Sequence, residues 1–77
     1  MMPFHDRLLS ELTQMDERLS KKKGYNPYAL AIMFGAVEGV TDADSFAAAF
    51  NPTRELHRVA RNLGLGLGVV HGQWVKK

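Results

Sequence analysis

Four basic or titratable side chains share one face of a predicted helix near the C-terminus. They are Arg54, His57, Arg58 and Arg61. At about 100° of rotation per residue they lie opposite an apolar face, so they form a basic stripe. Guanidinium groups pair well with carboxylates and phosphates. The stripe therefore predicts a surface for an acidic protein or a nucleic acid.

The distribution of charge supports this part of the chain as the functional one. The net charge is +2, but residues 1–23 carry five basic and four acidic groups, and residues 24–50 carry three acidic groups and no basic ones. Residues 51–77 carry five basic groups and one acidic group, with Lys76 and Lys77 at the end. A local excess of +4 predicts a partner of opposite charge.

Catalysis finds little support in the residue types. The chain has no cysteine, and its three histidines stand apart from other reactive groups. His57 lies beside arginines on a polar face, where a surface role is commoner than a general base. The Gly64–Gly68 segment lacks the lysine and the spacing of phosphate-binding loops. We expect no enzymatic activity, no cofactor and no metal.

Local signals predict the elements that position these residues. Asn26-Pro27 and Asn51-Pro52 each join a favoured N-cap to a proline, which fits the first helical turn. Residues 1–77 are predicted to form a mainly α, small four-helix domain with a C-terminal two-stranded β-hairpin, in an order that suits a helix-turn-helix or winged helix. The helices are expected at 3–23, 27–38, 42–50 and 52–63, and the hairpin at 67–76.

The helix expected at 27–38 is apolar on every side from Tyr28 to Val37. A helix of this kind is usually surrounded by protein, so we expect it to be the hub of the core. A chain of this size has few elements to surround it. The alternative is that one apolar face is a partner or oligomer interface, in which case a homodimer is one option.

Capping and turn residues give two further expectations. Thr41 and Asp44 have the spacing of a capping box, which would begin the third helix. The Lys21–Lys23 run would complement the C-terminal end of the first helix. His71-Gly72 would form a two-residue hairpin loop. Trp74 could close the core or contact a partner.

Two binding functions fit these features. In the first, the protein is a small non-enzymatic module whose basic C-terminal face engages another protein, such as a component of a nucleic-acid-binding complex. Phage and mobile-element inhibitors of the anti-CRISPR type are of this kind. In the second, helix 52–63 is the recognition helix of a winged-helix-like DNA-binding regulator. The residues expected to contact either partner are Arg54, His57, Arg58, Arg61, Trp74, Lys76 and Lys77.

The sequence also predicts where the protein acts. Its longest uncharged stretch, residues 24–37, is shorter than the roughly 20 apolar residues that cross a bilayer. The N-terminus lacks the uninterrupted apolar region and cleavage site of a secretory signal. We therefore expect a cytoplasmic protein without a membrane partner.

Overall fold

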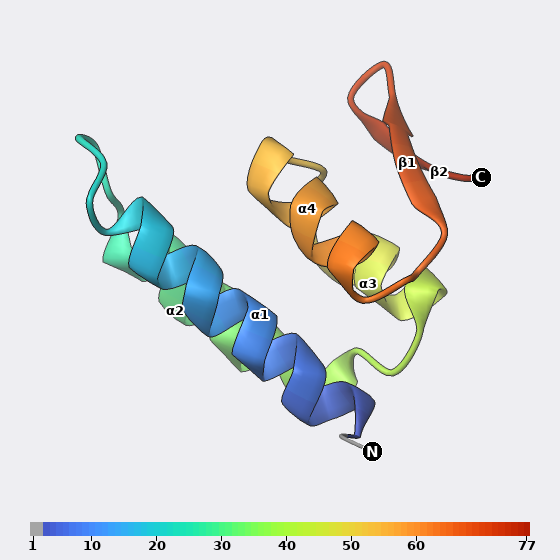
Figure 1. The fold of residues 1–77 in the computed structure, drawn as a ribbon, viewed down its shortest axis with the longest axis horizontal. Coiled ribbons are helices and arrows are strands. Elements are labelled where there is room, and N and C mark those ends of the chain that lie inside the picture. The colour runs from blue at the N-terminus through green and yellow to red at the C-terminus, as the bar shows by residue number, and fades with distance from the viewer. Residues whose placement is uncertain (1–2) are drawn as a thin grey trace.

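The computed structural model describes residues 3–77 and confirms the mainly α fold with a C-terminal hairpin (Figure 1). Within that range the elements are α1 (Phe4–Leu19), α2 (Pro27–Ala36), the short 3-10 helix η1 (Val37–Gly39), α3 (Ala43–Ala49), α4 (Arg54–Asn62), β1 (Leu67–Val70) and β2 (Gln73–Lys76).

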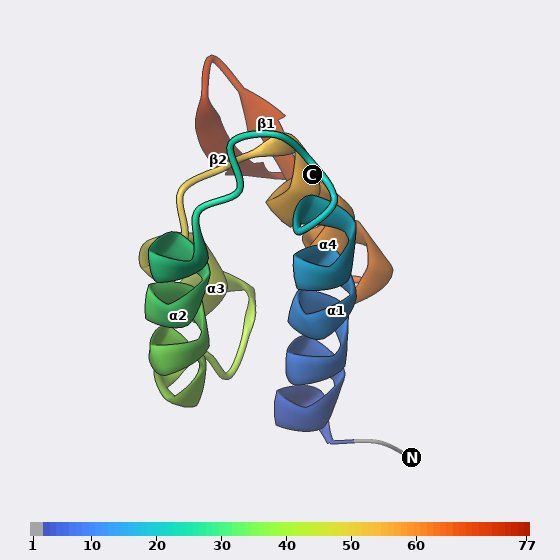
Figure 2. The ribbon, with the colours of Figure 1, turned by 90° about the vertical axis from the view of Figure 1, so that its left-hand side faces the viewer.

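The helices pack in two groups. In Figure 2, α2 and α1 lie side by side toward the viewer, with α3 behind α2 and α4 behind α1, and α1 contacts both α2 and α4. The β1 strand packs on α4, so the hairpin extends from the α4 side of the molecule (Figure 1).

Helix ends differ from the predicted ends by a few residues. The α1 helix stops at Leu19, and the three lysines that follow lie in a turn before Gly24, which adopts a positive φ of 87°. The α4 helix begins one residue after Thr53, whose hydroxyl accepts a hydrogen bond from the Leu56 amide at 3.1 Å. Thr53, rather than Asn51, is therefore the N-cap of α4.

The capping box of α3 lies one residue later than the sequence pattern predicted. Asp42, not Thr41, is the N-cap, and its carboxylate accepts from the Ser45 amide at 2.8 Å. The Ser45 hydroxyl accepts from the Asp42 amide at 3.0 Å. The Ser45 hydroxyl thus accepts the hydrogen bond from the N-cap amide that a glutamate carboxylate accepts in other capping boxes. Asp44 is therefore free to make another contact.

The expectation that α2 is the hub of the core is wrong. Among its residues only Leu30 is buried, while Tyr28 and Ile32 are 80% and 74% exposed. The core centres instead on Phe46, which meets the rings of Phe50 and Trp74 edge to face. The hairpin residue Trp74 thus packs on the core that the helices form.

The predicted hairpin loop is confirmed. Val70 pairs with Gln73, which leaves His71 and Gly72 as the two loop residues. Both have positive φ angles, 51° and 73°. Two successive positive φ angles match a type I′ turn, whose twist suits an antiparallel hairpin.

Candidate partner-binding face

The α4 helix separates its apolar and basic residues completely. Leu56, Val59 and Ala60 are buried against the rest of the fold, while the three arginines are exposed. Arg54, Arg58 and Arg61 follow the i, i+4 and i+7 spacing, so they form one row along the outer side of the helix. None of them forms an ion pair or a side-chain hydrogen bond within residues 3–77. Within residues 3–77, no other helix or strand carries as many basic side chains that lack an ion pair or hydrogen bond.

His57 stands apart from the row. His57 is partly buried, and its Nε2 atom is shielded from solvent without a hydrogen-bond partner among the described residues. The structure therefore brings together three of the four stripe residues and places the fourth at its edge.

The α1 helix adds cations that the sequence analysis did not place at the site. The Arg18 guanidinium donates to Glu55 Oε2 through Nε at 3.1 Å and Nη2 at 3.0 Å. Lys22 Nζ lies 3.9 Å from Glu55 Oε1. Arg7 Nη2 donates to the Asn62 carbonyl at 3.5 Å.

These contacts place α1 cations beside the arginine row. Glu55 and Asn62 are three and four residues from Arg58, so they lie next to it on α4. We call the row and its α1 neighbours the basic face; its members are Arg7, Arg18, Lys22, Arg54, Arg58 and Arg61. The eleven-residue spacing of Arg7 and Arg18 was the available signal that these two share a side of α1, whereas Lys22 reaches Glu55 from the turn that follows the helix.

The C-terminal candidates are mostly engaged within the protein. Trp74 Nε1 donates to the Phe50 carbonyl at 2.8 Å, and its ring packs on Phe46. Lys76 Nζ lies 2.8 Å from Asp44 Oδ1, and this hydrogen bond raises the pKa of Lys76. Lys77 is exposed at the chain end. Of these three residues, Lys77 alone presents a side chain without a partner in the described part of the chain.

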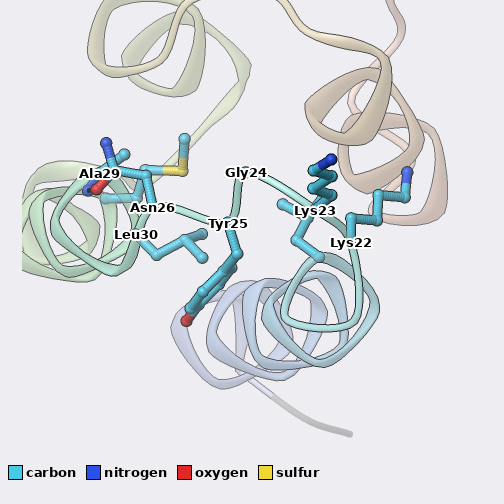
Figure 3. A pocket seen from close by; sticks show the side chains of 9 residues that line it. Lys22, Lys23, Gly24, Tyr25, Asn26, Ala29 and Leu30 are labelled. Carbon is cyan, nitrogen blue, oxygen red and sulfur yellow. Dashed lines mark hydrogen bonds between the residues drawn. The ribbon is translucent and has the colours of Figure 1, made fainter.

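A groove of about 250 Å³ lies under the loop that joins α1 to α2 (Figure 3). The Tyr25 ring points toward α1, and its hydroxyl donates to Asp16 Oδ1 at 2.6 Å. This hydrogen bond raises the pKa of Tyr25. Leu30 and Met33 supply apolar lining, and Lys22 and Lys23 lie at the rim. The groove holds no pair of groups suited to acid–base chemistry.

The described residues offer neither a metal site nor a membrane span. Residues 3–77 contain no cluster of three or more histidine, cysteine, aspartate or glutamate side chains placed to hold a metal ion. No helix in the described part of the chain is long and apolar enough to span a bilayer.

Comparison with known proteins returns no match to a protein family, to a curated protein or to a solved structure. The basic face must therefore be interpreted from its own geometry.

Proposed function

We propose that this protein is a non-catalytic binding module whose basic face docks on an acidic surface of another protein. The observation that carries the proposal is the row of three exposed arginines on α4, none of them engaged within residues 3–77. Arginine is enriched among the residues that dominate binding energy at interfaces. The i, i+4, i+7 row would match carboxylates spaced along a partner helix or strand.

The surroundings of the row favour pre-organised binding. Thr53 caps the start of α4, and Leu56, Val59 and Ala60 anchor its inner face. Glu55 is nearly buried and holds Arg18, so the one acidic group of α4 is neutralised and does not compete for the row. An ordered scaffold lowers the entropy that side chains lose when a complex forms.

DNA binding by a winged helix is the second candidate, because a helix with exposed arginines precedes a hairpin. A wing normally supplies cations to phosphates. Here Lys76 is bound to Asp44, and Trp74 points into the fold. Lys77 is therefore the one cation at the end of the hairpin without a partner among residues 3–77, and this small supply of free cations favours a protein partner over DNA.

Affinity capture with three immobilised forms of the protein tests the proposal. The unmutated protein, Arg58→Glu and Lys21→Glu would each be exposed to nuclease-treated lysate of the source organism. The two variants carry the same charge change, but Lys21 lies in the turn after α1 and outside the basic face. We expect the same proteins on the unmutated and Lys21→Glu supports and their loss from Arg58→Glu.

Equal capture by all three forms would exclude the basic face as the interface. A parallel anisotropy titration with a labelled mixed-sequence DNA duplex separates the two candidates. Duplex binding that persists at physiological salt, weakens steeply as salt rises and disappears in Arg58→Glu would replace the protein partner by DNA. No duplex binding at low salt would remove the winged-helix candidate.

A further inference from the structure

The outward side of α2 is an apolar surface that nothing in residues 3–77 covers. We call it the α2 outer face, and it comprises Tyr28, Ala31, Ile32 and Gly35, all exposed. Tyr28 and Ile32 follow each other at the i, i+4 spacing and are the two most exposed large apolar side chains described. Clustered exposure of this kind marks interaction surfaces, whereas single exposed residues do not.

Gly35 has no explanation within its own chain. It lies inside α2, where glycine weakens a helix. Its φ is not positive, and a Cβ atom built on it would meet nothing within 4 Å. No segment within residues 3–77 therefore requires a glycine at position 35. A second molecule that packs closely against α2 would require one.

The arrangement of large and small residues on this face is complementary to itself. The large side chain of Tyr28 stands at the start of the face and Gly35 at its end, with Ala31 and Ile32 at the middle. If two copies of α2 pair antiparallel about a two-fold axis near Ala31 and Ile32, Tyr28 of each copy lies over Gly35 of the other. Such an isologous contact uses the same surface twice and closes after two chains.

Charge also favours this arrangement. The α2 helix has no charged residue, so no like charges are brought together at its centre. The Lys21–Lys23 turn precedes it, and Glu38 follows it. Antiparallel pairing places the lysine end of one copy beside the Glu38 end of the other, whereas parallel pairing would align like ends. A strongly acidic or basic partner would find no side chain of opposite charge on α2.

We infer that the α2 outer face is the interface of a homodimer in which two α2 helices pack antiparallel through Tyr28, Ile32 and Gly35. The dimer would present two basic faces, one on each copy, and it does not depend on what those faces bind.

Sedimentation over a concentration series reaching the millimolar range tests the dimer. The unmutated protein and Arg58→Glu should both dimerise, because Arg58 lies on α4. Ile32→Glu would bury a carboxylate, and Gly35→Leu would fill the space for Tyr28, so each should raise the dissociation constant by more than about tenfold. Circular dichroism at the same concentrations checks that both variants keep the helical fold.

Cysteine mapping tests the direction of the helices, since the chain has no cysteine of its own. Under mild oxidation Ala31→Cys should form a disulfide-linked dimer. Tyr28→Cys and Gly35→Cys should each remain largely uncrosslinked alone and crosslink when mixed. Arg58→Cys is the control for random collision.

The alternative outcomes each overturn the inference. A strict monomer over the whole series would exclude a second copy, and capture of a different protein on this face would then identify another occupant. A dimer that survives both Ile32→Glu and Gly35→Leu would use another surface. Self-crosslinking of Tyr28→Cys without the mixed product would indicate parallel helices. None of these results bears on the basic face, whose test is capture by Arg58→Glu.

Discussion

The α2 and α4 helices are nearly equal in length but relate to the core in opposite ways. In α4 the apolar and charged residues occupy separate faces, and the apolar face alone is buried. In α2 every residue is apolar or small, yet the side of Leu30 is buried while the side of Tyr28 and Ile32 is exposed. The comparison shows that amphipathic segregation specifies the orientation of a helix, whereas uniform apolarity does not.

Chain size explains the difference. A short chain buries a smaller fraction of its surface than a long one, and here α1 packs on one side of α2. No further element remains in the described range to cover its other side. An all-apolar helix in so small a protein is therefore better interpreted as a helix with one face for the core and one for a partner.

The strongest test of this comparison removes one apolar side chain from each helix. Leu56 on α4 is 1% exposed, so Leu56→Ala should lower the free energy of unfolding by about 3 kcal/mol. Ile32→Ala should change that of the monomer by less than about 0.5 kcal/mol. Urea unfolding at low micromolar concentration, where a dimer would dissociate, measures both.

A comparable loss in the two variants would contradict the comparison, because it would mean that Ile32 is buried in the monomer. Repeating the measurement at high concentration separates monomer packing from association. There Ile32→Ala should cost more, while the cost of Leu56→Ala should stay the same.

A second test concerns Trp74, the partly buried hairpin residue that packs on the core at Phe46. Trp74→Phe keeps an aromatic ring beside Phe46 but removes the Nε1 donor to the Phe50 carbonyl. An unpaired buried carbonyl should lower the free energy of unfolding by about 2 kcal/mol. Chemical denaturation followed by circular dichroism measures the loss. An unchanged midpoint would mean that water replaces the indole donor.

A third test compares a glycine in α2 with the glycine that follows α4. Gly35→Ala should stabilise the monomer by up to about 1 kcal/mol, because its added Cβ meets nothing and alanine favours the helix. Gly64→Ala should destabilise by about 1 kcal/mol, because Gly64 has a φ of 70°. Thermal unfolding of dilute samples measures both signs. Destabilisation by Gly35→Ala would reveal a close contact within the chain.

How much the sequence could predict depended on whether the determining contact was local. The hairpin loop at His71-Gly72 and the apolar side of α4 were predicted, since turn chemistry and helical spacing are local signals. The α1 cations at the basic face were missed because the contact of Arg18 with Glu55 joins residues 37 positions apart.

Non-local contacts also explain two expectations that the structure does not bear out, the free side chain of Lys76 and the burial of α2. Lys76 was expected to face a partner, but its contact with Asp44 depends on how the hairpin returns across α3. The exposure of α2 depends on how many elements reach it. Residue spacing along the chain predicts neither the contact of Lys76 with Asp44 nor the exposure of α2.

The smallest predicted effect is a pH dependence of stability, and it compares a helix whose N-cap side chain titrates with helices whose N-cap side chains do not. Asn26 begins α2 and Thr53 begins α4 with neutral caps, whereas Asp42 begins α3 with a carboxylate. Hydrogen bonds from the Ser45 amide and hydroxyl lower the pKa of Asp42. A carboxyl whose pKa is lower in the folded state stabilises the protein above about pH 4 and loses that contribution as the pH falls through the lowered pKa.

Asp42→Asn tests this assignment, because asparagine also caps a helix but does not titrate. We expect the difference between the urea midpoints at neutral pH and at pH 3 to be smaller in Asp42→Asn than in the unmutated protein. Thr53→Asn is the matched control at α4 and should leave that difference unchanged. An equal pH dependence in all three proteins would place the acid sensitivity outside the cap of α3. A smaller difference in Asp42→Asn alone would locate an acid-sensitive contribution to stability at the start of α3, whereas α2 and α4 begin with caps that do not titrate.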